Sequence, residues 1–422
     1  MKLGNRIKRI RLLKGLKQAD ICHGIISPTH YSNIENCRYT PSIDTLKLLA
    51  GRLEVPERYF HNIYEDTTEM QNILSTLESK IEKESVEEVR QFLDLHQVQF
   101  RYIASIRQEF YFLLLKFLAL VKFGEDEQAF ELYESGIATV DIDESQLYVA
   151  TRQLYSYVTA VYHYYIGNYR KSVEYFKKIL QLHEDPYMIA RTSFNLALSH
   201  YHLCLFERSL KYANDAKNIY LTLHEWEKVG DCYNIISASY RELHEYSEAE
   251  TYIEKGFNIC QEEVLGLKSL LHHNYAVVLF DKKQLEDALT QVNKSIEIKK
   301  TLDYSDLFVS LNLRLEIYLE LNRISLITNE LDTVKSYIRN NKNEASFLLL
   351  RAMMEYKLGN LSKYEENICA SIEIFKQYTD LKQMKFATEH YATYLAKNKK
   401  YKKAFEMQVL CTECYKKHLG EI

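Results

Sequence analysis

Residues 157–180 read YVTAVYHYYIGNYRKSVEYFKKIL, residues 195–220 read NLALSHYHLCLFERSLKYANDAKNIY, and residues 234–257 read NIISASYRELHEYSEAETYIEKGF. In each segment, two stretches with helical spacing of apolar residues flank one or two polar residues or a glycine. Just after this break, a large residue precedes a small one by three positions, as Tyr169 precedes Ser172. The pattern predicts a pair of packed helices in each segment.

The same motif recurs along most of the chain. Its first residue, which we call the anchor, is found at Tyr169, Phe206, Tyr246, Leu285 and Tyr401, and degenerate copies have their anchors at Asp126, Ile324 and Leu361. Successive anchors lie 37 to 43 residues apart. A period of this length is typical of helical repeats, which stack into a solenoid. We therefore predict an all-α chain with a right-handed α-solenoid over residues 111–422, whose inner groove is lined by the first helix of each pair.

The composition agrees with a helical fold. The 422 residues include only 12 Gly and 4 Pro, which argues against sandwiches, barrels and Rossmann sheets with their many tight turns. There is no apolar stretch of about 18 residues and no secretion signal at the start, so we expect a cytoplasmic protein that contacts no membrane. The eight cysteines are then expected to be reduced.

Charge separates a small N-terminal module from the remainder. Residues 1–60 hold eleven Lys and Arg against five acidic residues, a net charge of +6, whereas the remaining residues carry −10. A basic module of this size favours a polyanionic partner such as double-stranded DNA. We place the domains at residues 1–62, 63–110 (a helical linker or partial repeat) and 111–422.

The basic module contains several helix signals close together. Glycines at 15 and 24 end helices expected over residues 3–14 and 17–23, and Ser27 with Pro28 begins a third helix that reaches residue 36. A fourth helix follows Ser42. The inward faces are expected to hold Ile7, Ile10, Leu13, Tyr31, Ile34, Ile43, Leu46, Leu49 and Leu53. Two short helices joined by a tight turn form the geometry that enters a major groove.

These residues resemble the Xre/Cro-type helix-turn-helix of phage repressors. The similarity lies in GLKQADI (15–21), SPTHYSNIENC (27–37) and PSIDTL (41–46). It implies that Gln18 contacts a phosphate, that Glu35 pairs with Arg11, and that Cys37 occupies a turn position where the family usually has glycine. The DNA-binding residues implied are Gln18, Pro28, Thr29, His30, Ser32, Asn33 and Arg38. A protein-binding or degenerate module of the same shape is the alternative.

Asparagines recur at one position of the repeats. Asn195, Asn234, Asn274 and Asn312 follow one another at intervals of 39, 40 and 38 residues, so they should form a ladder along the inner groove. An Asn side chain both donates and accepts, and can therefore bind the backbone of an extended peptide. Arg191 and Arg314 could receive a carboxylate. Alternatively, the amides only satisfy backbone groups between tightly packed repeats.

A helix-turn-helix module followed by about eight long tetratricopeptide-like repeats resembles the RNPP family of peptide-responsive quorum-sensing regulators. Within it, length and repeat number are most similar to the neutral-protease regulators, which also suggests a link to sporulation. The resemblance implies a DNA-binding transcription regulator whose repeat domain binds a short re-imported signalling peptide. It further implies a homodimer or higher oligomer whose assembly and DNA binding change with the peptide.

Two other functions stay open. The repeats could bind a response regulator and promote its dephosphorylation, as the related Rap proteins do, or they could simply dimerise a phage- or plasmid-type repressor. No catalytic residue, cofactor or metal site is predicted, so we expect no independent enzyme activity. Cys411, Cys414 and His418 lie at helical spacing, but three ligands alone are more typical of half-buried thiols than of a zinc site.

Overall fold

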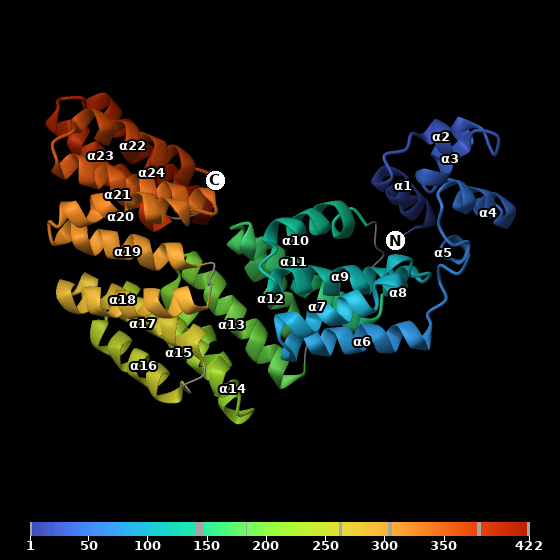
Figure 1. Ribbon diagram of the computed structural model, residues 1–422, viewed down its shortest axis with the longest axis horizontal. Coiled ribbons are helices and arrows are strands. Elements are labelled where there is room, and N and C mark those ends of the chain that lie inside the picture. Colours follow the sequence, from blue (N-terminus) through green and yellow to red (C-terminus); the bar gives the residue numbers. More distant parts are fainter. Residues whose placement is uncertain are drawn as a thin grey trace. The chain divides into compact units, whose positions relative to one another are not determined.

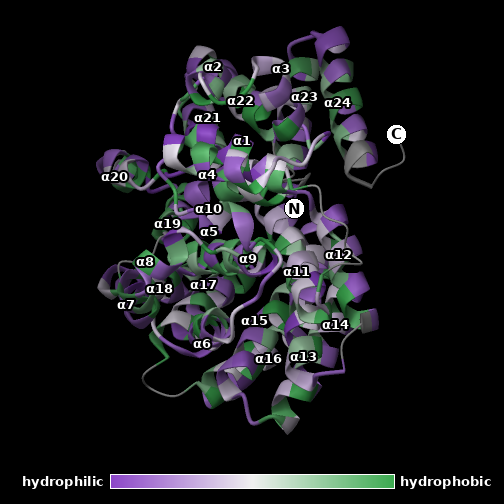
Figure 2. Cartoon of the chain, turned by 90° about the vertical axis from the view of Figure 1, so that its right-hand side faces the viewer, coloured by the Kyte–Doolittle hydropathy of each residue, from purple (hydrophilic) through white to green (hydrophobic). Residues whose placement is uncertain are grey.

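The computed structural model describes residues 2–140, 147–182, 184–260, 264–302, 306–377 and 381–419. Every regular element within these ranges is a helix, as Figure 1 shows in chain order from blue to red. Figure 2 shows hydrophilic and hydrophobic residues side by side on single helices, as expected where one face packs and the other meets solvent. The predicted all-α class is confirmed. The chain divides into two compact units, Met1–Tyr162 and His163–Ile422.

The first unit begins with five short helices: α1 (Leu3–Leu13), α2 (Gln18–Cys22), α3 (Pro28–Glu35), α4 (Ile43–Arg52) and α5 (Arg58–His61). Two serines cap helices as expected. The Ser27 hydroxyl accepts a hydrogen bond from the His30 N–H at 3.2 Å, and the Ser42 hydroxyl accepts one from the Thr45 N–H at 3.3 Å. Side chains from all five helices, among them Ile7, Ile21, Tyr31, Leu49 and Tyr59, form one buried core.

Two residues that were expected in the core are exposed instead. Leu13 is 75% exposed and Ile43 is 64% exposed. Leu13 is the last residue of α1 and Ile43 the first residue of α4. Helical spacing places them on the same face as buried neighbours, but the partner helices do not extend far enough to cover these two ends.

A second group of helices completes the first unit: α6 (Thr68–Lys83), α7 (Val86–Leu95), α8 (Gln97–Arg101), α9 (Ile106–Lys122) and α10 (Asp126–Leu132). α9 packs on both α6 and α10, and it is buried along most of its length. A short π-helix, Tyr133–Ile137, continues α10, and α11 (Val149–Tyr165) leads into the second unit.

The second unit is a stack of helix pairs. After α12 (Tyr169–Leu182), the pairs are α13 (Pro186–His202) with α14 (Phe206–Thr222), α15 (Trp226–Glu242) with α16 (Tyr246–Ile259), α17 (Leu265–Asp281) with α18 (Leu285–Thr301), α19 (Leu307–Glu320) with α20 (Ile324–Ser336), α21 (Asn341–Lys357) with α22 (Leu361–Phe375), and α23 (Leu381–Lys397) with α24 (Tyr401–Leu419). The two helices of each pair pack together, and successive pairs pack on one another.

All eight anchors predicted from the sequence begin the second helix of a pair. The residue three positions later is buried in every case: Ala129, Ser172, Ser209, Ala249, Ala288, Ile327, Tyr364 and Ala404. This position lies one turn into the second helix, where a small side chain allows the first helix to approach closely.

The turn inside each pair has one common feature. The residue two positions before each anchor has a positive φ, and the eight residues are Gly124, Gly167, Cys204, His244, Lys283, Asn322, Gly359 and Lys399. This left-handed conformation favours glycine because it brings a Cβ atom too close to the following carbonyl. The repeats therefore share one turn geometry, although only three of them have glycine there.

Replacing Gly359 with alanine is expected to lower the free energy of unfolding by about 1 kcal/mol. A Cβ added there meets no atom within 4 Å, so the loss would come from the φ of +76° and not from a clash. Lys399→Gly, at the same turn position of another repeat, is the control and should leave the stability unchanged or raise it. Thermal unfolding of both variants measures this, and equal losses in the two would contradict it.

Candidate functional site

The first candidate site is the outer face of α3. Tyr31 and Ile34 point into the core, so the intervening positions face outward. Of the residues proposed to read DNA, Pro28, Thr29 and Arg38 are exposed, and His30, Ser32 and Asn33 are half-buried. His30 packs edge-on against the ring of Tyr39, with 4.3 Å between the ring centroids. The structure thus places six of the seven proposed DNA contacts on α3 or directly after it.

The seventh, Gln18, is held by a buried carboxylate. Glu35 binds Arg11 through two hydrogen bonds, Nε to Oε1 at 2.6 Å and Nη2 to Oε2 at 2.9 Å, which confirms the expected pair. Gln18 Nε2 donates to the same Glu35 Oε2 at 2.7 Å. Burial would raise the pKa of Glu35, but the hydrogen bonds from Arg11 and Gln18 hold it below its ordinary value. Gln18 is therefore oriented at the start of α2 by a residue of α3.

Cys37 follows α3 in a left-handed conformation. Its φ is +58°, which is a conformation that favours glycine, so this chain has the expected turn with a cysteine in it. Gly4 of α1 lies against this turn, where an added Cβ would lie only 2.0 Å from the Ile34 carbonyl oxygen. The close contact of α1 with the end of α3 thus depends on Gly4.

A buried ion-pair network joins the helix-turn-helix module to α9 within the first unit. Arg6 has no exposed surface, and its Nη2 lies 2.7 Å from Glu109 Oε2. Its Nη1 also donates to the carbonyl oxygens of Tyr59 at 2.7 Å and Ala104 at 2.6 Å. Glu109 further accepts hydrogen bonds from Arg9 and from the Tyr59 hydroxyl. The sequence offered no signal for this pair, whose members are 103 positions apart.

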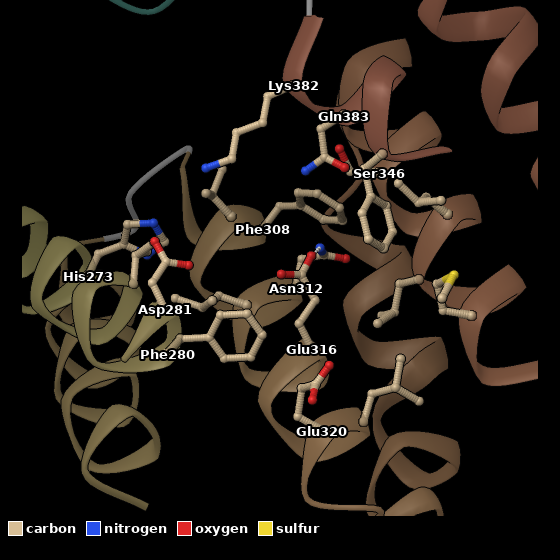
Figure 3. A pocket seen from close by; sticks show the side chains of 18 of the residues that line it. His273, Phe280, Asp281, Phe308, Asn312, Glu316, Glu320, Ser346, Lys382 and Gln383 are labelled. Atoms are coloured by element: carbon tan, nitrogen blue, oxygen red, sulfur yellow. Dashed lines mark hydrogen bonds between the residues drawn. The ribbon is translucent and has the colours of Figure 1, made fainter. Parts of the chain in front are cut away.

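The second candidate site is a cavity of about 580 Å³ in the second unit. It is lined by the first helices of five successive pairs, α15, α17, α19, α21 and α23. Figure 3 shows Asn312, Glu316 and Glu320 following one another along α19, with Asp281 and Phe280 of α17 opposite them. The apolar part of the lining includes Phe308, Leu313, Leu349, Leu350, Met353 and Phe386.

The structure brings part of the asparagine ladder together. Asn274 Nδ2 donates to Asn234 Oδ1 at 2.7 Å, so neighbouring repeats are linked by their ladder amides. Both residues are half-buried, and truncating either would leave the other amide without this partner. Asn312 lines the cavity, whereas the half-buried Asn195 lies on α13. The ladder was expected to bind a peptide backbone, but at Asn234 and Asn274 the two amides bind each other in this structure.

The two arginines proposed for the ladder differ in their surroundings. Arg191 is half-buried on α13, one turn before Asn195. Arg314 Nη2 lies 2.6 Å from Glu330 of α20, and its Nη1 donates to Asn293 of α18 at 3.3 Å. Its guanidinium therefore lies between the second helices of two pairs and away from the cavity, which the asparagine spacing alone could not reveal.

The cavity also holds charged residues that sequence reasoning missed. Arg241 binds the Tyr201 hydroxyl at 3.1 Å and contacts Glu242, and its Nη1 lies 3.5 Å from Asp281. Lys382 Nζ lies 3.1 Å from Glu242 Oε1, so an ion pair joins α15 to α23. The sequence did hold one usable signal, since Glu316 follows Asn312 by four positions and so lies on the same helix face.

Two ionisable side chains of the cavity have strongly perturbed pKa values. Burial lowers the pKa of His273 to about 3, and its Nδ1 lies 3.0 Å from the Ser310 hydroxyl. Burial raises the pKa of Glu316 to about 7; Asp281 adds to this, while Lys382 and the hydrogen bond from Asn312 act against it. His273 is therefore neutral near neutral pH, while Glu316 changes its charge there.

The raised pKa of Glu316 predicts a pH-dependent stability. The unfolded chain loses this proton near the ordinary glutamate pKa of 4.5 and the folded chain only near 7, so the ionised carboxylate costs stability. The free energy of unfolding should fall by about 1 to 3 kcal/mol as pH rises from 5 to 8. Charged groups facing the cavity with Glu316 are Arg241, Asp281, Lys283, Glu320, Lys342, Lys357 and Lys382.

Thermal unfolding of the parent and of Glu316→Gln at pH 5 and pH 8 checks this expectation. The variant should match the parent at pH 5 and be more stable than the parent at pH 8. Glu320→Gln, on the exposed end of the same helix, should follow the parent at both pH values. A variant that tracks the parent throughout would show that Glu316 titrates normally.

Comparisons with known proteins find matches for both parts of the chain. A helix-turn-helix family model matches residues 7–60, and a tetratricopeptide-repeat model matches residues 229–269. The transcriptional activator NprA of Geobacillus stearothermophilus is 24% identical over 409 residues, which cover 90% of this chain and 95% of NprA. This combination resembles the RNPP family. The resemblance rests on the two matched modules and on a full-length similarity to a transcription regulator.

Solved structures share the fold of most of the chain. A Rap protein complexed with Competence and Sporulation Factor matches with a TM-score of 0.69 at 14% identity, covering 84% of this chain and all of that one. NprR in complex with its cognate peptide NprX matches with a TM-score of 0.61 at 13% identity, covering 83% of this chain and 98% of that one. At these identities the likeness concerns the fold.

The cysteine motif near the C-terminus is only partly covered by the described residues. Cys411 is buried and Cys414 is half-buried, while the side chain of His418 lies outside the described residues. In the part of the chain that the structure covers, no three His, Cys, Asp or Glu side chains are grouped as metal ligands. None of the helices searched there has the length and apolar character needed to cross a bilayer.

Proposed function

We propose that this RNPP-like regulator binds a short peptide in the α15–α23 cavity and that the bound peptide changes how the protein binds DNA. The observation that carries the proposal is the cavity itself. It is lined by the first helices of five successive repeats, and its polar side chains stand among aromatic and aliphatic ones. A concave, partly apolar cavity of about 580 Å³ suits a few peptide residues.

The DNA-binding part of the proposal rests on α3. Thr29 and Asn33 would contact base edges in the major groove, and Gln18 and Arg38 would contact phosphates. A protein with this role acts where the DNA is, and we therefore place it in the cytoplasm. The proposal does not include an enzyme activity of this chain.

A synthetic heptapeptide library screened against the full chain tests the peptide part. We expect a family of related sequences that bind one per chain and raise the unfolding temperature, because a ligand of the folded state stabilises it by mass action. Ser346→Trp, which fills the cavity, should abolish this binding. Ser336→Trp, on the exposed surface of α20, is the matched control. Selected peptides that bind both variants equally well, or a library without any binder, would refute the proposal.

We further propose that the protein dimerises through α24. Its exposed residues include Tyr401 at 66%, Phe405 at 69% and Val409 at 36%, which recur every fourth position and form one apolar stripe. A symmetric reader of two DNA half-sites needs two copies of the helix-turn-helix, and a stripe of this kind suits a self-complementary contact.

Phe405→Glu is therefore expected to raise the dimer dissociation constant by at least about tenfold, because it places a charge in the centre of the apolar stripe. Light scattering over a range of protein concentrations measures this. Phe386→Glu, another half-exposed Phe that lies on α23, serves as the control and should leave the oligomer unchanged. A parent protein that stays monomeric at high micromolar concentration would exclude the dimer.

A further inference from the structure

Asn312 presents an unpaired acceptor to the cavity. Its side chain lines the cavity although the residue is only 5% exposed, and its Oδ1 has no hydrogen-bond partner in the structure. The orientation of the amide is fixed by Glu316, because Nδ2 donates to Glu316 Oε1 at 2.8 Å. A buried carbonyl oxygen without a donor is costly, which makes it a place where a ligand gains by supplying one.

Glu316 adds a carboxylate beside that acceptor. It lies one turn after Asn312 on α19, and in Figure 3 both side chains lie along the same face of the helix. Asp281 of α17 contributes further negative potential, which helps raise the pKa of Glu316. Oxygen acceptors of α17 and α19 therefore face each other in this part of the cavity.

Three cations near this cluster have other partners, although Lys382 also attracts the Glu316 carboxylate and lowers its pKa. Lys382 is paired with Glu242, Arg241 contacts Glu242 and Asp281, and Lys357 Nζ donates to the Leu319 carbonyl oxygen at 2.6 Å. Among the hydrogen bonds described, the one to the Glu316 carboxyl comes from the neutral Asn312 amide. The Glu316 carboxylate and the unpaired Asn312 Oδ1 thus lie side by side. A single ligand group that is cationic and carries several N–H donors could bind both.

We propose that Asn312 and Glu316 form a subsite for a cationic group with several N–H donors on the bound peptide. Such a group is the guanidinium or ammonium of an Arg or Lys side chain, or the N-terminal ammonium of the peptide. Phe280, Phe308 and Leu313 line the same cavity and would pack against an aliphatic stem. The inference rests on the proposed peptide binding and adds the charge class of the peptide.

The test uses the full chain and two synthetic heptapeptide libraries, one with free and one with acetylated N-termini. The parent should enrich Lys or Arg at one position in both libraries if a side chain fills the subsite. It should instead require the free N-terminus if the terminal ammonium does. Glu316→Gln should still select peptides but lose this preference, whereas Glu320→Gln, one turn further along α19, should retain it.

A mutant cycle then gives the size of the effect. Replacing the selected basic residue with norleucine, or acetylating the N-terminus, should weaken binding to the parent by about ten- to a hundredfold. The same change should cost less than about threefold with Glu316→Gln. Affinity for the basic peptide should also fall between pH 8 and pH 6, as Glu316 becomes protonated.

The outcomes separate this inference from the proposed function. Peptides selected by the parent without any preference for a cationic group, or a preference that survives in Glu316→Gln, would overturn the subsite and leave peptide binding intact. The absence of any selected peptide would overturn both. Unfolding temperatures of the variants, compared at pH 5, exclude misfolding as the cause of a lost preference.

Discussion

Glu109→Ala should lower the local stability of the helix-turn-helix module by about 3 to 5 kcal/mol, because it leaves the buried Arg6 guanidinium without its carboxylate. Arg9 and the Tyr59 hydroxyl would lose the same partner. The network joins α1 and α5 to α9, so the loss should loosen the DNA-binding module from the helices that follow it. Hydrogen exchange of amides in α1 and α5 should quicken by more than about a hundredfold.

The matched control is Glu125→Ala. Glu125 pairs with Arg90 at 2.5 Å, but this pair lies at the surface and should be worth less than about 1 kcal/mol. Exchange in α1 and α5 should therefore stay as in the parent. If Glu109→Ala and Glu125→Ala behave alike, the buried network does not hold the two parts together.

The second large effect concerns DNA sequence. Thr29→Ala combined with Asn33→Ala should weaken binding to a duplex selected in vitro by about 30- to 10,000-fold, because the two base contacts together contribute roughly 2 to 6 kcal/mol. Binding to a random duplex should change little, since phosphate contacts set that affinity. Anisotropy titrations at one fixed salt concentration measure both.

Gln18→Ala provides the contrast. Gln18 is held by Glu35 at the start of α2 and is proposed to contact a phosphate, so its loss should weaken selected and random duplexes alike. The assignment of α3 as the reading helix fails if the Thr29 and Asn33 variant loses the same factor on both duplexes.

The repeats could be predicted closely because local signals define them. Each anchor begins a helix directly after a left-handed turn, and the buried position three residues later can be recognised from its size in most repeats. Periodicity failed at the helix ends, where Leu13 and Ile43 have the spacing of core residues but no neighbour to cover them. Local pattern sets the helices, whereas the partner helices decide what is buried.

The candidate sites likewise combine contacts that a local motif predicts with contacts that depend on how distant helices pack. The Arg11 and Glu35 pair could be expected because a known motif places both residues, whereas Arg6 and Glu109 are 103 positions apart and meet only in the folded chain. The asparagine spacing correctly brought Asn234 and Asn274 together, yet it could not show that the two amides bind each other. Such contacts depend on the distance between repeats, which no single repeat specifies.

Control of DNA binding by a peptide can be tested through the affinity of the full chain for its selected duplex, measured with and without a saturating heptapeptide from the library screen. Coupling between two sites is typically worth about 1 to 3 kcal/mol. We therefore expect the peptide to change the dissociation constant for the duplex by at least about fivefold. Ser346→Trp should remove the change, while Ser336→Trp should keep it. A duplex affinity that stays the same with the peptide bound would contradict the proposed control.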